Sequence, residues 1–342
     1  MVVNQHTLFS IPDKSYASIA KREIRQMAEE AGFTAAEAGR LNIVVSEMTS
    51  NLAKHAADGG ELLVRSLGHG IEVICLDNGP GMVDSLRMLE DGVSTYGSAG
   101  EGLGAIKRQS DVFDLYSQPG MGTVIVSQVH RAAKPALAPN AGSHNIGFVM
   151  VPKPNETLCG DGLCVVEKGA EVYLLAMDGL GHGANAHEAA QAAVQAYASA
   201  LPQHPSDMLR NIHQQIRRTR GAVGMVVNVS GNSHKISYCG IGNIAGKLYS
   251  SDLSAAGSGY KNIISYNGII GHNIPGSLNN QQLDWGRNKT LILHSDGLKS
   301  RWDLAKYPNL SRHLATTIAA VLYKEHRRHT DDTLVLVLKS KV

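Results

Sequence analysis

Four short acidic motifs in the second half of the sequence could together hold metal ions. They contain Asp161, Asp178, Asp296 and the adjacent Asp331 and Asp332, and each lies at the end of an apolar run typical of a β-strand. A single Asp-Gly pair is most often a turn, because both residues favour turn backbone angles. Four such positions at strand ends indicate one shared site, and carboxylates and water are the ligands that Mg²⁺ and Mn²⁺ prefer. The sequence therefore predicts a site for two Mg²⁺ or Mn²⁺ ions.

Two ions held in this way would favour hydrolysis of a phosphomonoester. They can generate hydroxide from bound water and neutralise charge on a phosphoryl group during in-line attack. His182 lies in the segment Asp178-Gly-Leu-Gly-His-Gly183 and could donate a proton to the leaving serine oxygen, because histidine is the side chain that most often serves as a general acid. The sequence is equally compatible with a loop histidine that caps the following helix.

A second group of residues suited to chemistry lies in the first half. Glu47, Asn51 and His55 are four residues apart, so on a helix they share one face, which by default is a solvated one. Asp77-Asn-Gly-Pro-Gly81 ends an apolar strand, where a carboxylate can accept a hydrogen bond from an exocyclic amine and glycines let a flat ring approach the backbone. Gly97-Ser-Ala-Gly-Glu-Gly-Leu-Gly104 opens a helix, whose free N–H groups and dipole can hold a phosphate chain. These three elements in this order predict a nucleotide site.

The N-terminal motifs resemble those of the GHKL (Bergerat-fold) ATPases, and specifically the anti-sigma-factor serine kinases and RsbT-like switch kinases. The resemblance covers nearly all of residues 1–130, and an Asp-Gly-x-Ser-Thr segment before the glycine loop favours the RsbT-like branch. The matching segments are Ser46-Glu-Met-Thr-Ser-Asn-Leu-Ala-Lys-His-Ala56, Asp77-Asn-Gly-Pro-Gly81, Asp91-Gly-Val-Ser-Thr95, Gly100-Glu-Gly-Leu-Gly-Ala-Ile-Lys-Arg108 and Pro119-Gly-Met-Gly-Thr123.

The resemblance implies a role for each matching residue in binding ATP. Asn51 would coordinate a Mg²⁺ ion that bridges the phosphates. Asp77 would hold the adenine amine next to Gly79 and Gly81, and Thr123 would complete the base pocket. The residues that would wrap the phosphates are Gly100, Gly102 and Gly104.

Two acidic residues bear on whether this half transfers phosphate. Glu47 is the residue that the family uses to activate the attacking hydroxyl, and it lies one helical turn before Asn51, where a general base is well placed. Glu101 lies between the glycines of the loop, where it would repel phosphate if it pointed inward. Glu47 therefore predicts an active kinase, whereas Glu101 favours weaker nucleotide binding.

The C-terminal motifs look like those of the PP2C-type serine/threonine phosphatases, in the bacterial SpoIIE/RsbX branch, from about residue 145 to residue 338. The resemblance implies that Asp178 bridges the two metals with help from the Gly179 carbonyl, and that Asp161 binds one ion. The ligands of the other ion would be Asp296 and either Asp331 or Asp332.

Helical and strand patterns surround the motifs and must position them. In the first half, a helix with apolar residues from Tyr16 to Met27 is followed by a second that opens with the capping box Thr34-Ala-Ala-Glu37. Strands are then expected at Glu61–Leu67, Ile71–Leu76, Val112–Ser117 and Gly122–Val129, with a short helix at Leu103–Gln109.

In the second half, β-type runs dominate and the helices are few. Strands are expected at Ile146–Val151, Leu163–Glu167, Val172–Met177, Ala222–Val229, Lys235–Cys239, Thr290–His294 and Thr333–Leu338, and helices at Ala184–Ala200, Ser206–Arg218 and Leu310–His326. This pattern favours sheets with helices packed outside them. With the two resemblances, the fold class is a two-domain α/β protein, a Bergerat α/β sandwich followed by a PP2C-like αββα sandwich.

A segment rich in Ala and Pro marks the expected domain boundary. It runs from Arg131 to His144 and has no useful periodicity. We therefore expect a GHKL ATP-binding serine kinase domain at residues 1–130, a linker at 131–144 and a phosphatase domain at 145–342, and a flexible linker suggests independent domains.

Composition excludes several other classes of protein. The formal net charge of +2, from 32 basic and 30 acidic residues, gives little reason to expect a nucleic-acid or membrane partner. The four cysteines are too scattered for a disulfide framework or a zinc site, which favours buried, reduced thiols. No apolar run approaches membrane-spanning length and no signal peptide is evident, so we expect a cytoplasmic protein.

The two resemblances together predict a bifunctional enzyme. It would phosphorylate and dephosphorylate one serine or threonine on a STAS-domain regulator of a sigma factor, in partner-switching signalling. The alternative is a metal-dependent phosphatase whose GHKL half binds ATP and a partner without transferring phosphate. An interaction protein with two vestigial sites would be expected to lack Asn51 or the metal-binding acids, and all of these are present.

Overall fold

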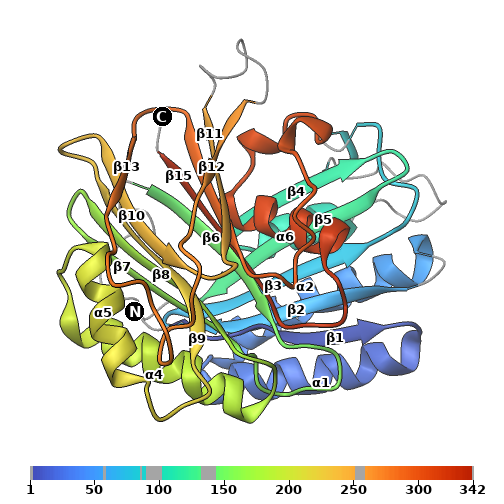
Figure 1. Ribbon diagram of the computed structural model, residues 1–342. Coiled ribbons are helices and arrows are strands. Elements are labelled where there is room, and N and C mark those ends of the chain that lie inside the picture. Colours follow the sequence, from blue (N-terminus) through green and yellow to red (C-terminus); the bar gives the residue numbers. More distant parts are fainter. Residues whose placement is uncertain are drawn as a thin grey trace. The chain divides into compact units, whose positions relative to one another are not determined.

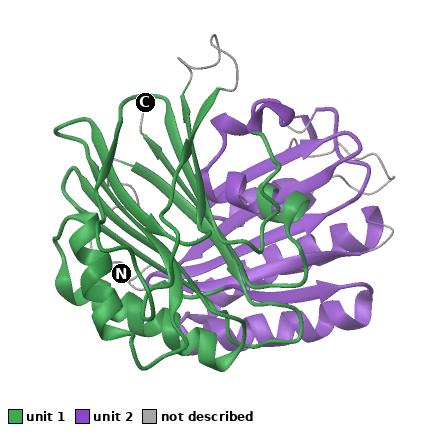
Figure 2. Ribbon diagram, viewed as in Figure 1, with its two compact units in different colours: residues 1–5, 138–303, 322–342 green, residues 6–137, 304–321 purple. Residues whose placement is uncertain are grey.

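The computed structural model describes residues 3–56, 59–84, 87–89, 102–131, 144–250 and 259–340. The chain forms two compact units (Figure 2). Unit 1 contains Met1–Gln5, Ala138–Asp303 and Leu322–Val342, and unit 2 contains His6–Leu137 and Leu304–Val321. Each unit therefore includes a piece from the opposite end of the sequence.

Unit 2 is built on one antiparallel sheet with the strand order β1-β2-β3-β5-β4 (Figure 1). Its strands are β1 (Thr7–Ile11), β2 (Gly60–Leu67), β3 (Gly70–Asp77), β4 (Val112–Gln118) and β5 (Gly122–His130). The sequence patterns predicted four of these strands. They did not predict β1, a five-residue strand that obtains its partner from β2, far along the chain.

Two long helices and one short helix contribute to the core on one face of this sheet. They are α1 (Lys14–Glu30), α2 (Ala35–His55) and α3 (Gly102–Gln109), and a 3₁₀ turn, η1, covers Arg87–Leu89. The predicted capping box at the start of α2 is present, with the Thr34 side chain accepting from the Glu37 N–H and the Glu37 carboxylate accepting from the Thr34 N–H. The stripe from Leu41 to Leu52 is buried against the sheet, so α2 has a fixed rotation about its axis.

The helix expected at Leu310–His326 is shorter in the structure and begins in unit 2. Residues Leu310–Arg312 form a 3₁₀ turn, η4, after another at Leu304–Lys306, η3, and α6 covers Ala315–His326. The Asp114 carboxylate on β4 accepts hydrogen bonds from His313 Nδ1 at 2.8 Å, from the Leu314 N–H at 2.8 Å and from Thr317 Oγ1 at 2.6 Å. A side chain distant in sequence thus supplies the cap of α6, which local patterns could not show.

Unit 1 contains two antiparallel five-stranded sheets, with the orders β13-β10-β9-β8-β7 and β12-β11-β14-β15-β6. The strands are β6 (His144–Val151), β7 (Asp161–Lys168), β8 (Glu171–Gly179), β9 (Ala222–Ser230), β10 (Lys235–Ile241), β11 (Ala245–Ser250), β12 (Tyr260–Ile263), β13 (Gln281–Asp284), β14 (Lys289–His294) and β15 (Thr333–Ser340). The sequence patterns predicted seven of them but not β11, β12 or β13, which are short and only partly apolar.

The core of unit 1 lies between its sheets and under two helices. One buried cluster combines residues of both sheets, such as Leu174 on β8 and Leu336 on β15. A second lies between the β7–β10 sheet and the helices α4 (Ala184–Ala200) and α5 (Pro205–Gln215). The four cysteines are buried free thiols, as predicted. Among the described residues, no helix is long and apolar enough to cross a membrane.

Candidate functional sites

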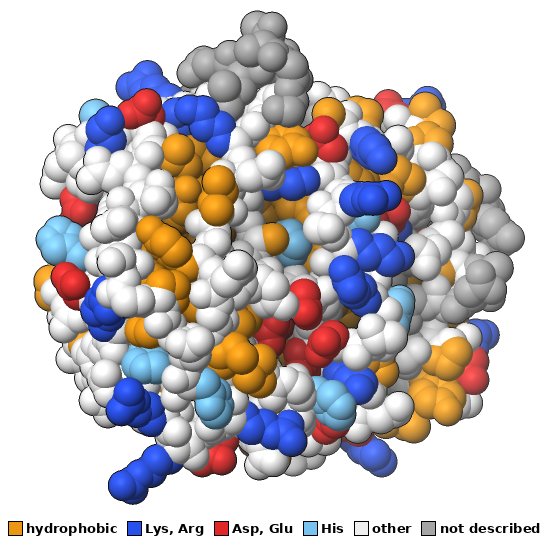
Figure 3. Space-filling model, in the orientation of Figure 1, with side chains coloured by type: hydrophobic (Ala, Val, Ile, Leu, Met, Phe, Trp, Pro, Cys, Tyr) orange, Lys and Arg blue, Asp and Glu red, His pale blue; other side chains and the backbone are white. Residues whose placement is uncertain are grey.

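The predicted acidic residues of unit 1 gather around a small pocket. This pocket has a volume of about 140 Å³. Its lining residues are Asp178, Leu180, Gly181, His182, Val223, Asn243, Asp296 and Asp331. Figure 3 shows acidic side chains gathered on the face of the molecule that it draws.

The sheets of unit 1 explain how acids far apart in sequence come together. Asp161 and Asp178 are direct partners across the β7–β8 pair. Asp296 lies two residues beyond β14, and Asp331 and Asp332 immediately precede β15, the strand that pairs with β14. The carboxylates therefore stand at neighbouring strand ends, as the sequence motifs predicted.

The two adjacent acids before β15 have different environments. Asp331 lines the pocket. Asp332 is only 3% exposed, and its Oδ1 accepts a hydrogen bond from the Lys153 N–H at 2.8 Å. Its Oδ2 lies beside Gly160, where an added methyl group would come within 2.7 Å of it. Of the pair, the structure places Asp331 at the pocket and Asp332 behind it.

Crowding and burial disfavour negative charge on these acids. Burial, reinforced by Asp296 and Asp331, raises the pKa of Asp178 to about 8. Burial and the neighbouring Asp178 raise the pKa of Asp161 well above its usual value, and burial with Asp331 raises that of Asp296. A cation would offset this repulsion and favour the ionised carboxylates.

Two buried oxygen atoms support this interpretation. Asp161 Oδ1 and Asp332 Oδ2 have no hydrogen-bond partner, although buried carboxylate oxygens are normally paired. In the described part of the chain, no group of three or more His, Cys, Asp or Glu side chains is arranged closely enough to hold a metal ion as it stands. The donor set nevertheless fits a hard cation, because it consists of carboxylates and the strand-end backbone at Gly179.

Two polar residues to which the sequence reasoning gave no role, Ser295 and Asn243, support this site. Ser295 Oγ donates to Asp161 Oδ2 at 2.8 Å and accepts from the Leu334 N–H at 2.9 Å, so the Asp161 carboxylate is held in one orientation. Asn243 Nδ2 donates to Asp296 Oδ2 at 2.7 Å. Ser295 lies within the predicted motif Ser295-Asp-Gly297, which gave it no role of its own, whereas Asn243 follows β10 with no local signal.

The predicted polar row on α2 of unit 2 is present. Glu47, Asn51 and His55 are each half-buried on that helix. A methyl group added at Gly102 would lie 2.8 Å from Glu47 Oε2 and 3.6 Å from Asn51 Oδ1. The start of α3 therefore approaches the row closely, and Gly102 and Gly104 lie in its first turn. Gly100 and Glu101 lie outside the described residues.

The Asp77 motif and Thr123 meet at the end of the sheet. They are direct partners across the β3–β5 pair. Asp77 Oδ1 accepts from the Gly79 N–H at 2.8 Å, and Thr123 Oγ1 lies 3.0 Å from Ser117 Oγ. Gly81 has φ of +68°, and a methyl group there would overlap the Gln118 carbonyl oxygen at 2.0 Å, so this turn requires glycine. The structure thus brings together the residues predicted to hold a base.

A pocket of about 560 Å³ lies beside this motif. Its lining residues are Pro12, Asp13, Lys14, Ala53, Lys54, His55, Ala56 and Pro80. It shares Pro80 with the Asp77 motif and His55 with the polar row, and its charged lining residues are Lys14, Lys54 and Asp13. Burial, together with Lys54, lowers the pKa of His55, which favours its neutral form.

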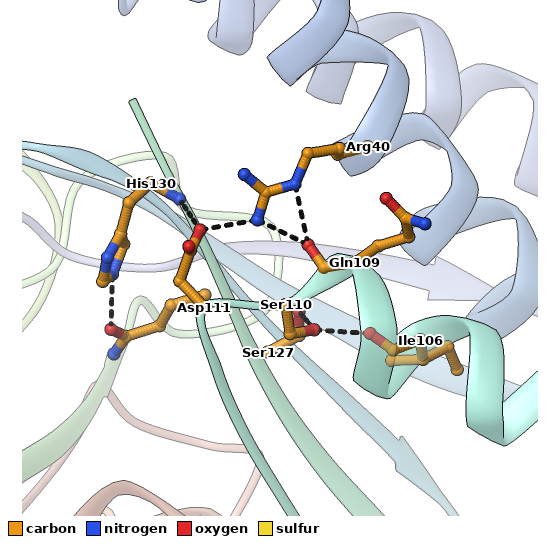
Figure 4. A network of polar contacts seen from close by, with 8 residues as sticks. Arg40, Ile106, Gln109, Ser110, Asp111, Ser127 and His130 are labelled. Atoms are coloured by element: carbon orange, nitrogen blue, oxygen red, sulfur yellow. Dashed lines mark hydrogen bonds and ion pairs between the residues drawn. The ribbon is translucent and has the colours of Figure 1, made fainter. Parts of the chain in front are cut away.

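A polar network fixes the far end of α3 (Figure 4). Arg40 of α2 donates to the Gln109 carbonyl oxygen from Nε at 3.2 Å and from Nη2 at 2.9 Å. Arg40 Nη2 also donates to Asp111 Oδ2 at 2.7 Å, and the same oxygen accepts from the His130 N–H at 2.7 Å. Arg40 thus satisfies a carbonyl at the C-terminal end of α3 and ties this helix to α2, which carries Glu47.

Residues 12–128 match the family described as the histidine kinase-like ATPase domain. The serine/threonine-protein kinase RsbT of Bacillus subtilis (strain 168) is 38% identical over 111 residues, which are 31% of this chain and 84% of RsbT. The chain belongs to the histidine kinase-like ATPase family. This assignment confirms the resemblance to RsbT-like kinases.

Solved structures are similar to the remainder of the chain. One, described as "The bacterial stressosome: a modular system that has been adapted to control secondary messenger signaling", is 26% identical with a TM-score of 0.53, covering 57% of this chain and 99% of that chain. RsbX in complex with magnesium is 18% identical with a TM-score of 0.50, covering 58% of this chain and 97% of that chain. The predicted fold class, a Bergerat-type domain joined to a PP2C-like one, is confirmed.

Proposed function

We propose that this protein is a bifunctional switch enzyme that phosphorylates and dephosphorylates one serine or threonine on a STAS-domain regulatory protein. The observation that carries the proposal is that one chain contains two groups of residues suited to opposite reactions. Glu47 and Asn51 lie beside the start of α3 in an RsbT-like ATPase domain. Asp178, Asp296 and Asp331 line a pocket in a domain with a phosphatase fold.

In the phosphatase site, Asp178 and the Gly179 carbonyl would hold two Mg²⁺ or Mn²⁺ ions between them. Asp161 would bind one ion, and Asp296 with Asp331 the other. Bound ions would supply an activated water and neutralise charge on the phosphoryl group. The raised pKa of Asp178, about 8, supports this use, because a buried carboxylate surrounded by other acids favours a cation nearby.

In the kinase site, Asn51 would hold Mg²⁺ against the phosphates of ATP, and Asp77 with Thr123 would bind the adenine. Glu47 would accept the proton of the substrate hydroxyl as the hydroxyl oxygen forms a bond to the γ-phosphorus, while the bond from the γ-phosphorus to the β–γ bridging oxygen breaks and ADP leaves. The approach of the Glu47 carboxylate to Gly102, within 2.8 Å of an added methyl group, supports this role because Gly102 opens the helix expected to face the phosphates.

The proposed partner follows from two of the similarities. The kinase half is 38% identical to RsbT over 111 residues, and a solved structure whose description names the bacterial stressosome is similar to 57% of this chain. A STAS-domain protein that alternates between phosphorylated and unphosphorylated forms would be a substrate for both sites. Opposed activities in one chain would then set its phosphorylated fraction.

The second candidate is a metal-dependent phosphatase whose ATPase-like half binds ATP and a partner without transferring phosphate. Glu101, an acid within the glycine loop, favours this alternative because it would oppose phosphate binding. The presence of Glu47 favours the bifunctional enzyme.

Transfer of labelled phosphate separates the two candidates. Asp178→Asn protein is incubated with γ-labelled ATP, Mg²⁺ and a STAS-domain protein encoded beside it, so that the phosphatase cannot erase the product. We expect label on the partner, and no label when Glu47→Gln is added, while ATP binding persists. If no label accumulates but the wild type hydrolyses the phosphorylated partner, the alternative holds.

A further inference from the structure

A tight turn before Asp161 connects two parts of the acidic site. It covers residues 153–156, closed by a hydrogen bond from the Glu156 N–H to the Lys153 carbonyl at 3.0 Å. At its first residue, the Lys153 N–H donates to Asp332 Oδ1 at 2.8 Å. Asn155 has φ of 70°, the left-handed conformation that asparagine tolerates in turns. The turn is therefore anchored to the acidic cluster and projects Glu156 from a defined place.

The Glu156 carboxylate contacts His182, which lines the acidic pocket. Glu156 Oε1 lies 2.9 Å from His182 Nδ1. The loop around His182 needs glycine on both sides, because Gly181 and Gly183 have φ of 86° and 74°. A methyl group added at Gly183 would lie 3.2 Å from Glu156 Oε2, so the carboxylate also fits closely against the loop.

Stability alone does not account for this pair. The side chains of His182 and Glu156 are 48% and 33% exposed, and partly exposed ion pairs contribute little to folding. The contact has a clear consequence for the imidazole, however. With Nδ1 occupied by the carboxylate, Nε2 is the ring nitrogen left to exchange a proton with a group in the pocket.

We propose that Glu156 is a positioning residue that orients His182 as the proton donor to the seryl or threonyl leaving oxygen. This inference rests on the proposed phosphatase function and names a residue that the acidic motifs do not contain. In the reaction, a water oxygen forms a bond to phosphorus while the bond from phosphorus to the seryl oxygen breaks. The seryl oxygen takes a proton from His182 Nε2. The attacking water releases a proton to solvent, and His182 Nε2 regains a proton from solvent.

The choice of leaving group tests this role. Alkoxide is a poor leaving group and needs a proton donor, whereas p-nitrophenolate leaves readily without one. With Mn²⁺ present, Glu156→Ala should lower kcat for a phosphoserine peptide about tenfold or more, within the range of general-acid effects. It should change kcat for p-nitrophenyl phosphate less than about twofold, and KM little for either substrate. Glu156→Gln, which keeps an oxygen acceptor for Nδ1–H, should recover part of the loss.

A double-mutant cycle links the effect to His182. His182→Gln should show the same selective loss, and adding Glu156→Ala to it should cause no further loss. Glu188→Gln, which changes an exposed glutamate on α4, serves as the matched control and should leave both activities unchanged.

Two outcomes have different meanings. If Glu156→Ala lowers both activities equally, or if its effect adds fully to that of His182→Gln, the positioning role is wrong while the phosphatase function stands. If the wild type hydrolyses neither substrate with Mn²⁺ or Mg²⁺, the proposed function itself fails.

Discussion

Glu72 on β3 shows how single buried charges are stabilised in unit 2. Its side chain is fully buried, with Oε1 2.6 Å from Arg65 Nε and 3.4 Å from His6 Nε2, and Oε2 accepting from Gln128 Nε2 at 2.7 Å. Burial alone would raise the pKa of Glu72, but Arg65 and His6 outweigh it and lower the pKa from 4.5 to about 2. The charged form is therefore the stable one in the folded protein.

This depressed pKa predicts how acid destabilises unit 2. The lowered value means that Glu72 contributes stability above its unfolded pKa, about 3 kcal/mol by linkage, and that this contribution is lost as pH falls from 4.5 toward 2. Glu72→Gln should remove this pH-dependent component and lower stability at neutral pH, since Arg65 loses its counterion. Hydrogen exchange of β3 amides, followed from neutral pH down through this acidic range, measures both effects. Glu30→Gln, an exposed change on α1, should behave like the wild type.

Ser295 gives a prediction for the metal site. Its hydroxyl is the donor that holds Asp161 Oδ2 at 2.8 Å, and groups that orient metal ligands typically affect affinity by ten- to a hundredfold. Ser295→Ala should therefore weaken Mn²⁺ binding by about tenfold or more, as measured by calorimetric titration. Ser199→Ala, on the outer side of α4, is the control. Unchanged affinity in Ser295→Ala would show that Asp161 needs no such support or binds no metal.

Among single residues, the acids and glycines of the motifs could be predicted from the sequence better than the polar residues that hydrogen-bond to the site. Asp178, Asp296 and Asp331 could be selected because each lies in a motif at a strand end, and the structure brings them to one pocket. Glu156 and Asn243 could not be selected, because their importance comes only from the distant residues that they contact.

Among the elements, α6 depends on a contact that is remote in sequence. Asp114 on β4 accepts three hydrogen bonds at its start, from His313, Leu314 and Thr317. Burial opposes the charge on Asp114, yet these donors outweigh burial and lower its pKa. Asp114→Ala should cost about 1–3 kcal/mol, because it removes a cap and leaves buried donors unpaired. Faster hydrogen exchange in the first turn of α6 would measure this loss.

A comparison between two acids of unit 2 makes the test specific. Asp13→Ala removes the cap of α1, where Asp13 Oδ1 accepts from the Ser15 N–H at 2.7 Å. It should speed exchange at the start of α1 and leave α6 unchanged. If the amides in the first turn of α6 exchange at the same rate in Asp114→Ala and in the wild type, other contacts hold the start of this helix.

The elements also show where periodicity is sufficient for prediction. Helices α1, α2 and α4 have a local apolar stripe and, in the first two, a local side-chain cap, so their sequences determine them. Strand β1 and the short strands of unit 1 are defined by their partners, and α6 by Asp114. Patterns read along the chain contain none of that information.

At the scale of the whole molecule, the units do not coincide with continuous halves of the sequence. Residues Leu304–Val321 lie between β14 and β15 of unit 1 in the chain but belong to unit 2. Leu304, Tyr307 and Leu310 in this segment are buried, each at most 8% exposed. Cleavage of the chain in the Ala- and Pro-rich segment, residues 131–144, would therefore separate residues 304–321 from the rest of unit 2.

This discontinuity predicts that the two halves of the chain bind each other when produced separately. Residues 1–137 would lack the segment that meets Asp114, and residues 138–342 would carry it without its partner. We expect the two fragments, mixed at equal concentration, to co-elute in size-exclusion chromatography and to melt at a higher temperature than either alone, because association restores the buried contacts of residues 304–321.

Asp114→Ala in the first fragment should weaken this association about five- to a hundredfold, since it removes three hydrogen bonds to the segment. Asp13→Ala, whose side chain caps α1 instead, should leave the affinity unchanged. Fragments that elute separately, with each as stable alone as when mixed, would show that residues 304–321 are not required by unit 2.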